Sequence, residues 1–101
     1  MIATVKHNTY ANVKVSNILN KKGKLVANQF IILLDNSVYF QSYATVIVAF
    51  IDGTTFLDKD KWNYGATTSK YRNIFLNEDT DTTRRKIEEG LYFLTNLNGN
   101  D

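Results

Sequence analysis

The chain has no cysteine and no proline, a single histidine, and five glycines that lie far apart. Without cysteine it has no disulfides, thiolate metal sites or thiol nucleophiles. The lone His7 has no second histidine with which to share a metal, so the usual zinc sites are excluded and His7 is expected to be solvated. The glycines form no phosphate-binding GxGxxG or GxxxxGK[ST] loop. We therefore expect no metal, no cofactor and no catalytic centre of these kinds.

Long hydrophobic runs are also absent. The longest apolar stretches, 30–34 and 46–51, hold five and six residues, whereas a membrane-spanning helix needs roughly 20. The first residues do not combine a charged segment with an apolar one, as a signal peptide would. We therefore expect no membrane span and a cytoplasmic location in a bacterial cell.

The composition predicts one folded domain. The chain has 101 residues, of which 44% are apolar and 22% are charged. These shares are ordinary for globular proteins, and a chain of this length builds one hydrophobic core. We expect a single α+β domain over residues 1–96 and a frayed C-terminal tail over 97–101.

The first half of the chain is rich in strand and turn signals. Residues 12–19 and those from 25 onward flank the turn-forming 20–24, which predicts a hairpin with a basic tip. A short helix over 10–19 is the alternative, because it would also gather apolar residues on one face. Further strands are expected at 29–34, 37–43, 45–51 and 54–57, with turns at Asp35-Asn36 and Asp52-Gly53. The continuous apolarity of 45–51 predicts a central strand covered on both faces, or a short buried helix.

The second half predicts two short helices and a last strand. Tyr71, Ile74 and Phe75 have the spacing of one helical face, so a helix is expected over about 69–77, capped by one of Thr67, Thr68 or Ser69. A second helix over 82–89 is expected to end at Gly90, and a strand should follow at 91–95. The fold class is therefore α+β, with a mostly antiparallel sheet of about four to six strands and two C-terminal helices.

The charge distribution leaves a nucleic-acid function open. Residues 1–34 contain five lysines and no acid, although the net charge of the whole chain is only +2. A solvated sheet face is the plainer explanation, but a basic N-terminal surface could also contact phosphates. The lysines proposed for such contacts are Lys14, Lys21, Lys22 and Lys24.

Two other groups of polar residues could hold a ligand. Carboxylates gather at 58–60 and 78–81; the second group is better explained as helix capping than as a cation site. Hydroxyls at the start of the 69–77 helix lie beside Lys70 and Arg72, an arrangement that can hold an anion. The alternative is that Thr68 or Ser69 caps this helix while Trp62, Tyr64 and Tyr71 pack on the sheet.

Two stretches resemble a known pattern. YFQSYATVIVA at 39–49 and WNYGATTSK at 62–70 resemble the motifs F-x-S-Y-x-T-x-I-A and W-x-Y-S-x-T-T-S-K of small uncharacterised proteins from phages and mobile elements of low-GC Gram-positive bacteria. Gly65 stands where serine is common, and the first stretch has one extra valine. The resemblance covers about 39–73 and implies a phage or mobile-element context and a sheet-plus-helix fold, but no activity.

The most favoured function is a non-catalytic accessory protein that binds a host or phage protein. One role that fits is inhibition of a defence or replication enzyme. The thirteen aromatic residues supply the residue types that anchor interfaces. Nucleic-acid binding is the first alternative and a small enzyme the second, and a homodimer is compatible with the sequence. The candidate binding residues are Tyr39, Tyr43, Trp62, Tyr64, Thr68, Ser69, Lys70, Tyr71 and Arg72.

Overall fold

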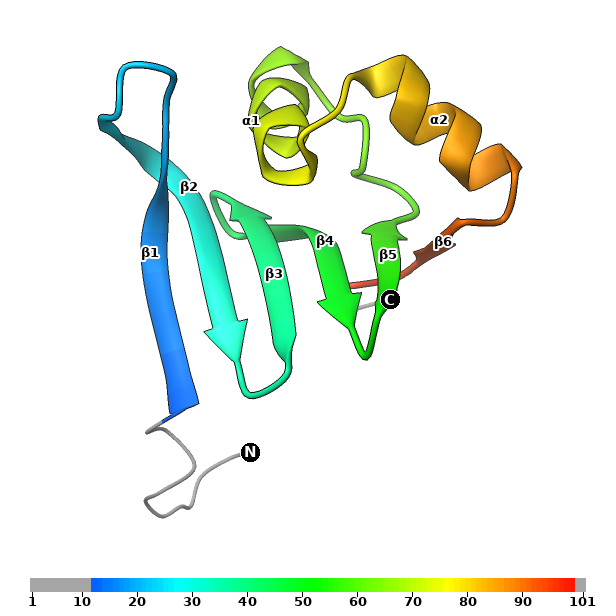
Figure 1. The fold of residues 1–101 in the computed structure, drawn as a ribbon, viewed down its shortest axis with the longest axis horizontal. Coiled ribbons are helices and arrows are strands. Elements are labelled where there is room, and N and C mark those ends of the chain that lie inside the picture. The colour runs from blue at the N-terminus through cyan, green and yellow to red at the C-terminus, as the bar shows by residue number, and fades with distance from the viewer. Residues whose placement is uncertain (1–11, 100–101) are drawn as a thin grey trace.

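The strands follow one another across a single sheet in the order of the chain (Figure 1). The computed structural model describes residues 12–99. Neighbouring strands pair antiparallel, except that β5 and β6 are parallel. A parallel pair needs a long crossover, and here the two helices provide it. The elements are β1 (Val13–Leu19), β2 (Leu25–Leu34), β3 (Ser37–Ser42), β4 (Thr45–Ile51), β5 (Thr54–Asp58), α1 (Ala66–Leu76), α2 (Thr80–Glu88) and β6 (Tyr92–Thr95).

Short turns join the antiparallel strands. Asp52 and Gly53 both have positive φ between β4 and β5, which is the backbone that a two-residue hairpin turn requires and that glycine adopts at least cost. Asp35 also has positive φ between β2 and β3. The predicted turns at both places are confirmed, and so is the hairpin with the basic tip.

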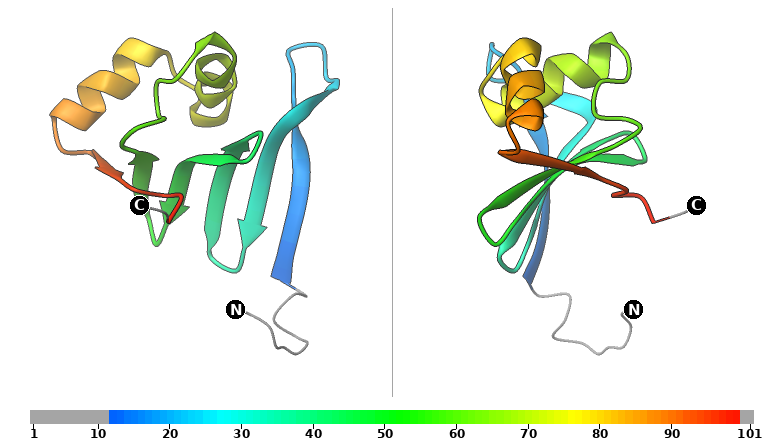
Figure 2. Two further views of the ribbon diagram at one scale, coloured as in Figure 1. Left: turned by 180° about the vertical axis from the view of Figure 1, so that it is seen from behind. Right: turned by 90° about the vertical axis from the view of Figure 1, so that its right-hand side faces the viewer.

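Both helices lie on one face of the sheet, over the end at which β3 turns into β4 (Figures 1 and 2). The ring of Phe75 in α1 stacks on that of Phe40 in β3, with centroids 5.7 Å apart. Phe40 belongs to a fully buried cluster with Ile47, Val48 and Leu57. Partly buried residues from the connection, both helices and β6 surround this cluster: Trp62, Tyr71, Phe75, Leu76, Ile87 and Tyr92.

The predicted α+β class is confirmed, with a strand number at the upper end of the expected range. The helical alternative for the first segment is wrong over Val13–Leu19, which is strand β1; positions 10 and 11 lie outside the described residues. β2 is one strand from Leu25 rather than a strand that starts at 29. Helix α1 begins at Ala66, three residues before the predicted start, and Gly65 occupies its N-cap position.

The centre of β4 is buried on both faces, because Val48 and Ala49 are both 0% exposed, but within residues 12–99 the helices cover only one of the two faces. Val48 points toward α1 with its cross-strand partner Phe40. Ala49 points to the opposite face with its partners Tyr39 and Phe56, because successive side chains of a strand alternate. Neither helix lies on that second face.

Candidate functional site

Two exposed tyrosines stand at the rim of one hollow. Tyr43 lies in the β3–β4 turn and is 59% exposed, and Tyr64 lies just before α1 and is 61% exposed. The hollow between them has a volume of about 230 Å³. It is lined by Ser42, Tyr43, Thr45, Ile47, Lys61, Tyr64 and Thr68. We call this set the tyrosine pocket.

Backbone contacts hold Tyr43 in place. Its N–H donates to the carbonyl of Asn28 at 2.7 Å, and its own carbonyl accepts from the side-chain amide of Gln41, also at 2.7 Å. Its φ of 57° lies in the left-handed region, which costs a non-glycine residue energy that the surrounding contacts must offset. The side chain is therefore displayed from a fixed backbone rather than from a free loop.

The other side of the tyrosine pocket is fixed by helix α1. The hydroxyls of Ser42 and Thr68 are 3.1 Å apart in a buried hydrogen bond that joins the end of β3 to α1. The ammonium of Lys61 lies 4.0 Å from the centroid of the Tyr64 ring, a cation–π distance that restrains both side chains. The pocket is thus built from segments far apart in the sequence.

The chemistry of the tyrosine pocket suits binding. Ile47 contributes an apolar surface, the hydroxyls and Lys61 offer polar contacts, and the two tyrosine rings supply large area at low conformational cost. Tyrosine is enriched at the centres of protein interfaces.

The start of α1 is not organised as predicted. No side chain caps this helix, so the prediction that Thr67, Thr68 or Ser69 caps it is wrong. The Thr68 hydroxyl instead bonds Ser42, and the Ser69 hydroxyl donates to the side chain of Asn63 at 3.1 Å. The ammonium of Lys70 lies 5.3 Å from the centroid of the Tyr71 ring.

Arg72, which we placed among the candidate binding residues, is fully buried. Its guanidinium donates to the Trp62 carbonyl, to the Asn73 side chain at 2.9 Å and to the Thr80 hydroxyl at 2.6 Å. Burial, together with the nearby charge of Arg84, lowers the pKa of Arg72. Arg72 therefore ties the loop before α1 to the start of α2, and the structure does not bring it beside Lys70 at a common surface.

The remaining aromatic candidates are divided between the two faces of the sheet. Trp62 and Tyr71 pack against the core cluster on the helix side, as the structural alternative expected. Tyr39 points to the opposite face, because it is paired with Ala49 and Ile32. Of the predicted residues, only Tyr43, Tyr64 and Thr68 meet in the tyrosine pocket. Four lining residues were not predicted, since nothing in their local sequence separates them from ordinary strand and loop residues: Ser42, Thr45, Ile47 and Lys61.

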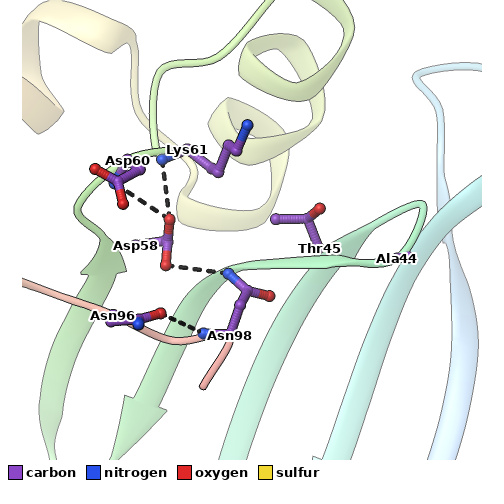
Figure 3. A pocket seen from close by; sticks show the side chains of 7 residues that line it. All are labelled: Ala44, Thr45, Asp58, Asp60, Lys61, Asn96 and Asn98. Carbon is purple, nitrogen blue, oxygen red and sulfur yellow. Dashed lines mark hydrogen bonds between the residues drawn. The ribbon is translucent and has the colours of Figure 1, made fainter. Parts of the chain in front are cut away.

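A second hollow, of about 310 Å³, surrounds the carboxylate of Asp58 (Figure 3). One carboxylate oxygen accepts from the N–H groups of Asp60 and Lys61, at 3.2 and 3.0 Å. The other accepts from the N–H of Leu97 at 2.9 Å and the side-chain amide of Asn98 at 3.0 Å. Two of these hydrogen-bond donors belong to the loop that follows β5 and two to the C-terminal segment. Asp58 therefore joins the end of β5 to the C-terminal segment.

Asn98 extends this connection to β4. Its side chain accepts from the N–H of Val46 at 2.8 Å and donates to the carbonyl of Val46 at 3.1 Å. The boundary of the domain at residue 96 stays a prediction, but Leu97 and Asn98, which we placed in the tail, are hydrogen-bonded to the sheet.

The second carboxylate group forms a network between α2 and β6. Asp79 accepts from the N–H of Thr82 at 2.8 Å, which confirms the predicted capping. Glu78 is nearly buried and accepts from Lys86 at 2.8 Å, Tyr92 at 3.0 Å and Thr83 at 2.6 Å. Burial alone would raise the pKa of Glu78, but these hydrogen bonds outweigh it and hold the pKa below its ordinary value. The bond with Glu78 also raises the pKa of the Lys86 ammonium.

We expect Glu78→Gln to remove part of the acid sensitivity of folding. Because the pKa of Glu78 is lower in the folded chain, its stabilisation is complete above its unfolded pKa of about 4.3 and is lost as the pH falls through the lower folded value. The substitution should cost about 1–2 kcal/mol near pH 7 and less near pH 3. Urea unfolding at both pH values measures this difference.

Asp81→Asn is the matched control for Glu78→Gln, because Asp81 lies three positions further along, in the first turn of α2, but its side chain is almost fully exposed beside Arg84. It should change the free energy of unfolding by less than about 0.5 kcal/mol at either pH. An equal loss for both variants, or a loss from Glu78→Gln that does not shrink in acid, would contradict the role assigned to Glu78.

The basic N-terminal residues meet helix α1 at one place. Lys21 and Lys22 at the β1–β2 tip and Lys70 on α1 line a hollow of about 310 Å³. The adjoining hollow also includes Lys21 and Lys70, with Glu78 at its far side. Lys14 lies further along β1, next to Leu33 of β2. Two of the four predicted lysines, Lys21 and Lys22, therefore converge with Lys70, which comes from a separate part of the chain.

Among residues 12–99, no three histidine, cysteine or acidic side chains come together as a metal site would require. No helix in that range has the length and apolarity needed to cross a membrane. His7 lies outside the described residues. Asp58 and Asp60 line one hollow, whereas Tyr64 lines another.

Comparison with known proteins places most of the chain in one family. A family model matches residues 13–90, and its description is a family of unknown function (DUF8033). No curated protein and no solved structure matches the chain.

Proposed function

Since the chain belongs to this family of unknown function, we propose its role from its own surface. It is a non-catalytic protein that binds another protein through the tyrosine pocket. The observation that carries the proposal is that Tyr43 and Tyr64, twenty-one positions apart, are both about 60% exposed at the rim of one hollow. Large aromatic side chains held in this way are typical anchors of protein interfaces.

The partner that fits has an apolar or aromatic side chain flanked by polar groups. Such a side chain would enter between the two rings and contact Ile47, while Lys61 and the tyrosine hydroxyls would meet polar groups at the margin. A volume of about 230 Å³ suits one or two side chains rather than a large cofactor. The surface therefore favours a short segment of a protein.

The biological setting of the proposal comes from the resemblance of residues 39–73 to phage and mobile-element proteins. In that setting the partner would be a host or phage protein in the bacterial cytoplasm. Inhibition of a defence or replication enzyme is one effect that such binding would have. Both statements rest on the resemblance and on the exposed tyrosines.

We expect the double substitution Tyr43→Ala with Tyr64→Ala to abolish capture of the partner. The tagged full-length chain would be incubated with a lysate of a low-GC Gram-positive bacterium, with and without nuclease and at two salt concentrations, and retained proteins identified by mass spectrometry. Loss of two interface anchors should weaken binding at least tenfold. Because both side chains are exposed, stability should change by less than about 1 kcal/mol.

The matched control is Leu19→Ala with Leu25→Ala, which removes two exposed apolar side chains at the far edge of the sheet. This variant should retain the partner as the unmodified chain does. Equal retention by the tyrosine variant and the control would remove the tyrosine pocket from the binding site. A protein that is retained through nuclease and high salt, and lost only from the tyrosine variant, would support the proposal.

Nucleic-acid binding is the second candidate, and one observation favours it. The hollow lined by Lys21, Lys22 and Lys70 concentrates positive charge between the hairpin tip and α1, where a phosphate backbone could be held. The same capture experiment distinguishes the two functions. Nucleic acid that is retained at low salt and lost at moderate salt, with no protein surviving nuclease, would favour this candidate.

A further inference from the structure

The sheet face away from the helices forms a broad surface without charge. The central cross-strand row on this face joins all six strands. A second row lies on one side of it and a third on the other. The rows are Val15, Ile32, Tyr39, Ala49, Phe56 and Phe93; Val13, Leu34, Ser37, Ile51 and Thr54; and Asn17, Phe30, Gln41 and Val46. We call these fifteen residues the open face.

The open face is mostly apolar and carries no charge. None of its side chains is ionisable except the hydroxyl of Tyr39, and only four are other polar groups. Val15 is 60% exposed and Phe93 48% exposed at its two ends. Within residues 12–99, Asn98 of the C-terminal segment lies beside Val46 of this face, and neither helix lies on it (Figures 1 and 2). The opposite face, by contrast, buries Phe40, Val48 and Leu57 under the helices.

The size of the open face is close to the lower end of what a stable dimer buries. Six strands roughly 4.8 Å apart span about 24 Å between the outer strands, and three rows roughly 7 Å apart span about 14 Å. With side chains at the margins included, the projected area is roughly 500 Å². A patch of this size is among the largest that a typical monomer exposes, and such patches are often functional. A stable dimer buries roughly 600–1,000 Å² of accessible surface per partner, so the open face would supply most of the lower value.

We propose that the open face binds a second copy of this chain, so that two sheets pack face to face with the helices outside. A two-fold axis packs the same surface against itself. On a charged face this would bring like charges together, but the open face carries no charge. Sheets packed in this way lie roughly 10 Å apart and interdigitate their side chains. The tyrosine pocket, on the helix side, stays accessible in the dimer, so this inference is independent of the proposed function.

The test is the mass of the full-length chain in solution. Sedimentation velocity at about 1 to 100 µM covers the affinities expected of such an interface. The unmodified chain should sediment as a dimer. Val15→Glu or Phe93→Glu should give a monomer, because each substitution should raise the dissociation constant of the dimer at least tenfold. Both side chains are already exposed in the single chain, so circular dichroism should show both variants folded.

Leu33→Glu is the matched control, because Leu33 lies on β2 between two open-face residues but points to the helix side and is 42% exposed. This variant should remain a dimer. Methyl groups of Val15 and Ile32 should also show intermolecular contacts in a mixed-label NMR sample, a readout that needs no substitution. An unmodified chain that is monomeric throughout would overturn the proposal and assign the open face to residues 1–11 or to a different protein. A dimer that Leu33→Glu disrupts as strongly as Val15→Glu, or one without those contacts, would overturn it too.

Discussion

Asp58→Ala is expected to lower the free energy of unfolding by about 3 kcal/mol or more. Asp58 is 2% exposed and accepts four hydrogen bonds, two from the loop before α1 and two from the C-terminal segment. Removal of the carboxylate would leave these donors without an acceptor in a poorly hydrated place, and each such donor costs about 1–3 kcal/mol. For a domain of this size the midpoint of thermal unfolding should fall by roughly 12–24 °C.

Asp60→Ala is the control for Asp58→Ala. Asp60 lies two positions away, in the same hollow, but its side chain is mostly exposed and pairs only with Lys59 at the surface. Loss of an exposed ion pair should cost less than about 0.5 kcal/mol. Equal effects of the two substitutions in urea unfolding would show that the C-terminal segment does not depend on the Asp58 carboxylate.

Phe40→Ala should be the most damaging substitution in the core, with a cost of about 3–5 kcal/mol. Phe40 is fully buried in β3 and stacks on Phe75 of α1. Its removal would leave a cavity where the helix meets the sheet, so both the transfer free energy and the packing contacts are lost. Because small domains are stable by only about 5–15 kcal/mol, the substitution should remove a large share of the total stability of the domain.

Phe50→Ala tests whether burial accounts for that loss. Phe50 points to the same face, from the next strand, but is about 40% exposed. Its truncation should cost about 1 kcal/mol, because much of its surface already contacts water. The measurement is urea unfolding followed by tryptophan fluorescence, since Trp62 packs against the same cluster. A Phe40→Ala variant no less stable than Phe50→Ala would contradict this description of the core.

The elements that were predicted well depend on neighbours close in the sequence. Asp52-Gly53 has the turn residues that a tight hairpin needs, and the β-branched run of 45–51 prefers an extended chain. The second helix was found because Asp79, directly before it, caps its start by accepting from the N–H of Thr82. The start of α1 was misplaced because Gly65 replaces the expected side-chain cap, so the hydroxyls of Thr68 and Ser69 gave a misleading local signal.

The candidate site was predicted only in part. Tyr43, Tyr64 and Thr68 were named as binding residues, but nothing within a few positions of either tyrosine shows that the two share a pocket. Arg72 carries the same local signal as Lys70, yet it is buried against Trp62 and Thr80 while Lys70 lines a surface hollow. The difference depends on which side of α1 faces the sheet.

The sequence by itself determined the class of the fold, the order and approximate bounds of its strands and helices, and the absence of cysteine chemistry. These features follow from composition and from preferences that act over a few residues. Only the tertiary structure decided that Asp58 binds Asn98 forty positions away, that two tyrosines share a pocket, and that one face of the sheet is left without a helix. Such contacts depend on strand register and on where the helices return to the sheet, and both are set by packing of the whole core.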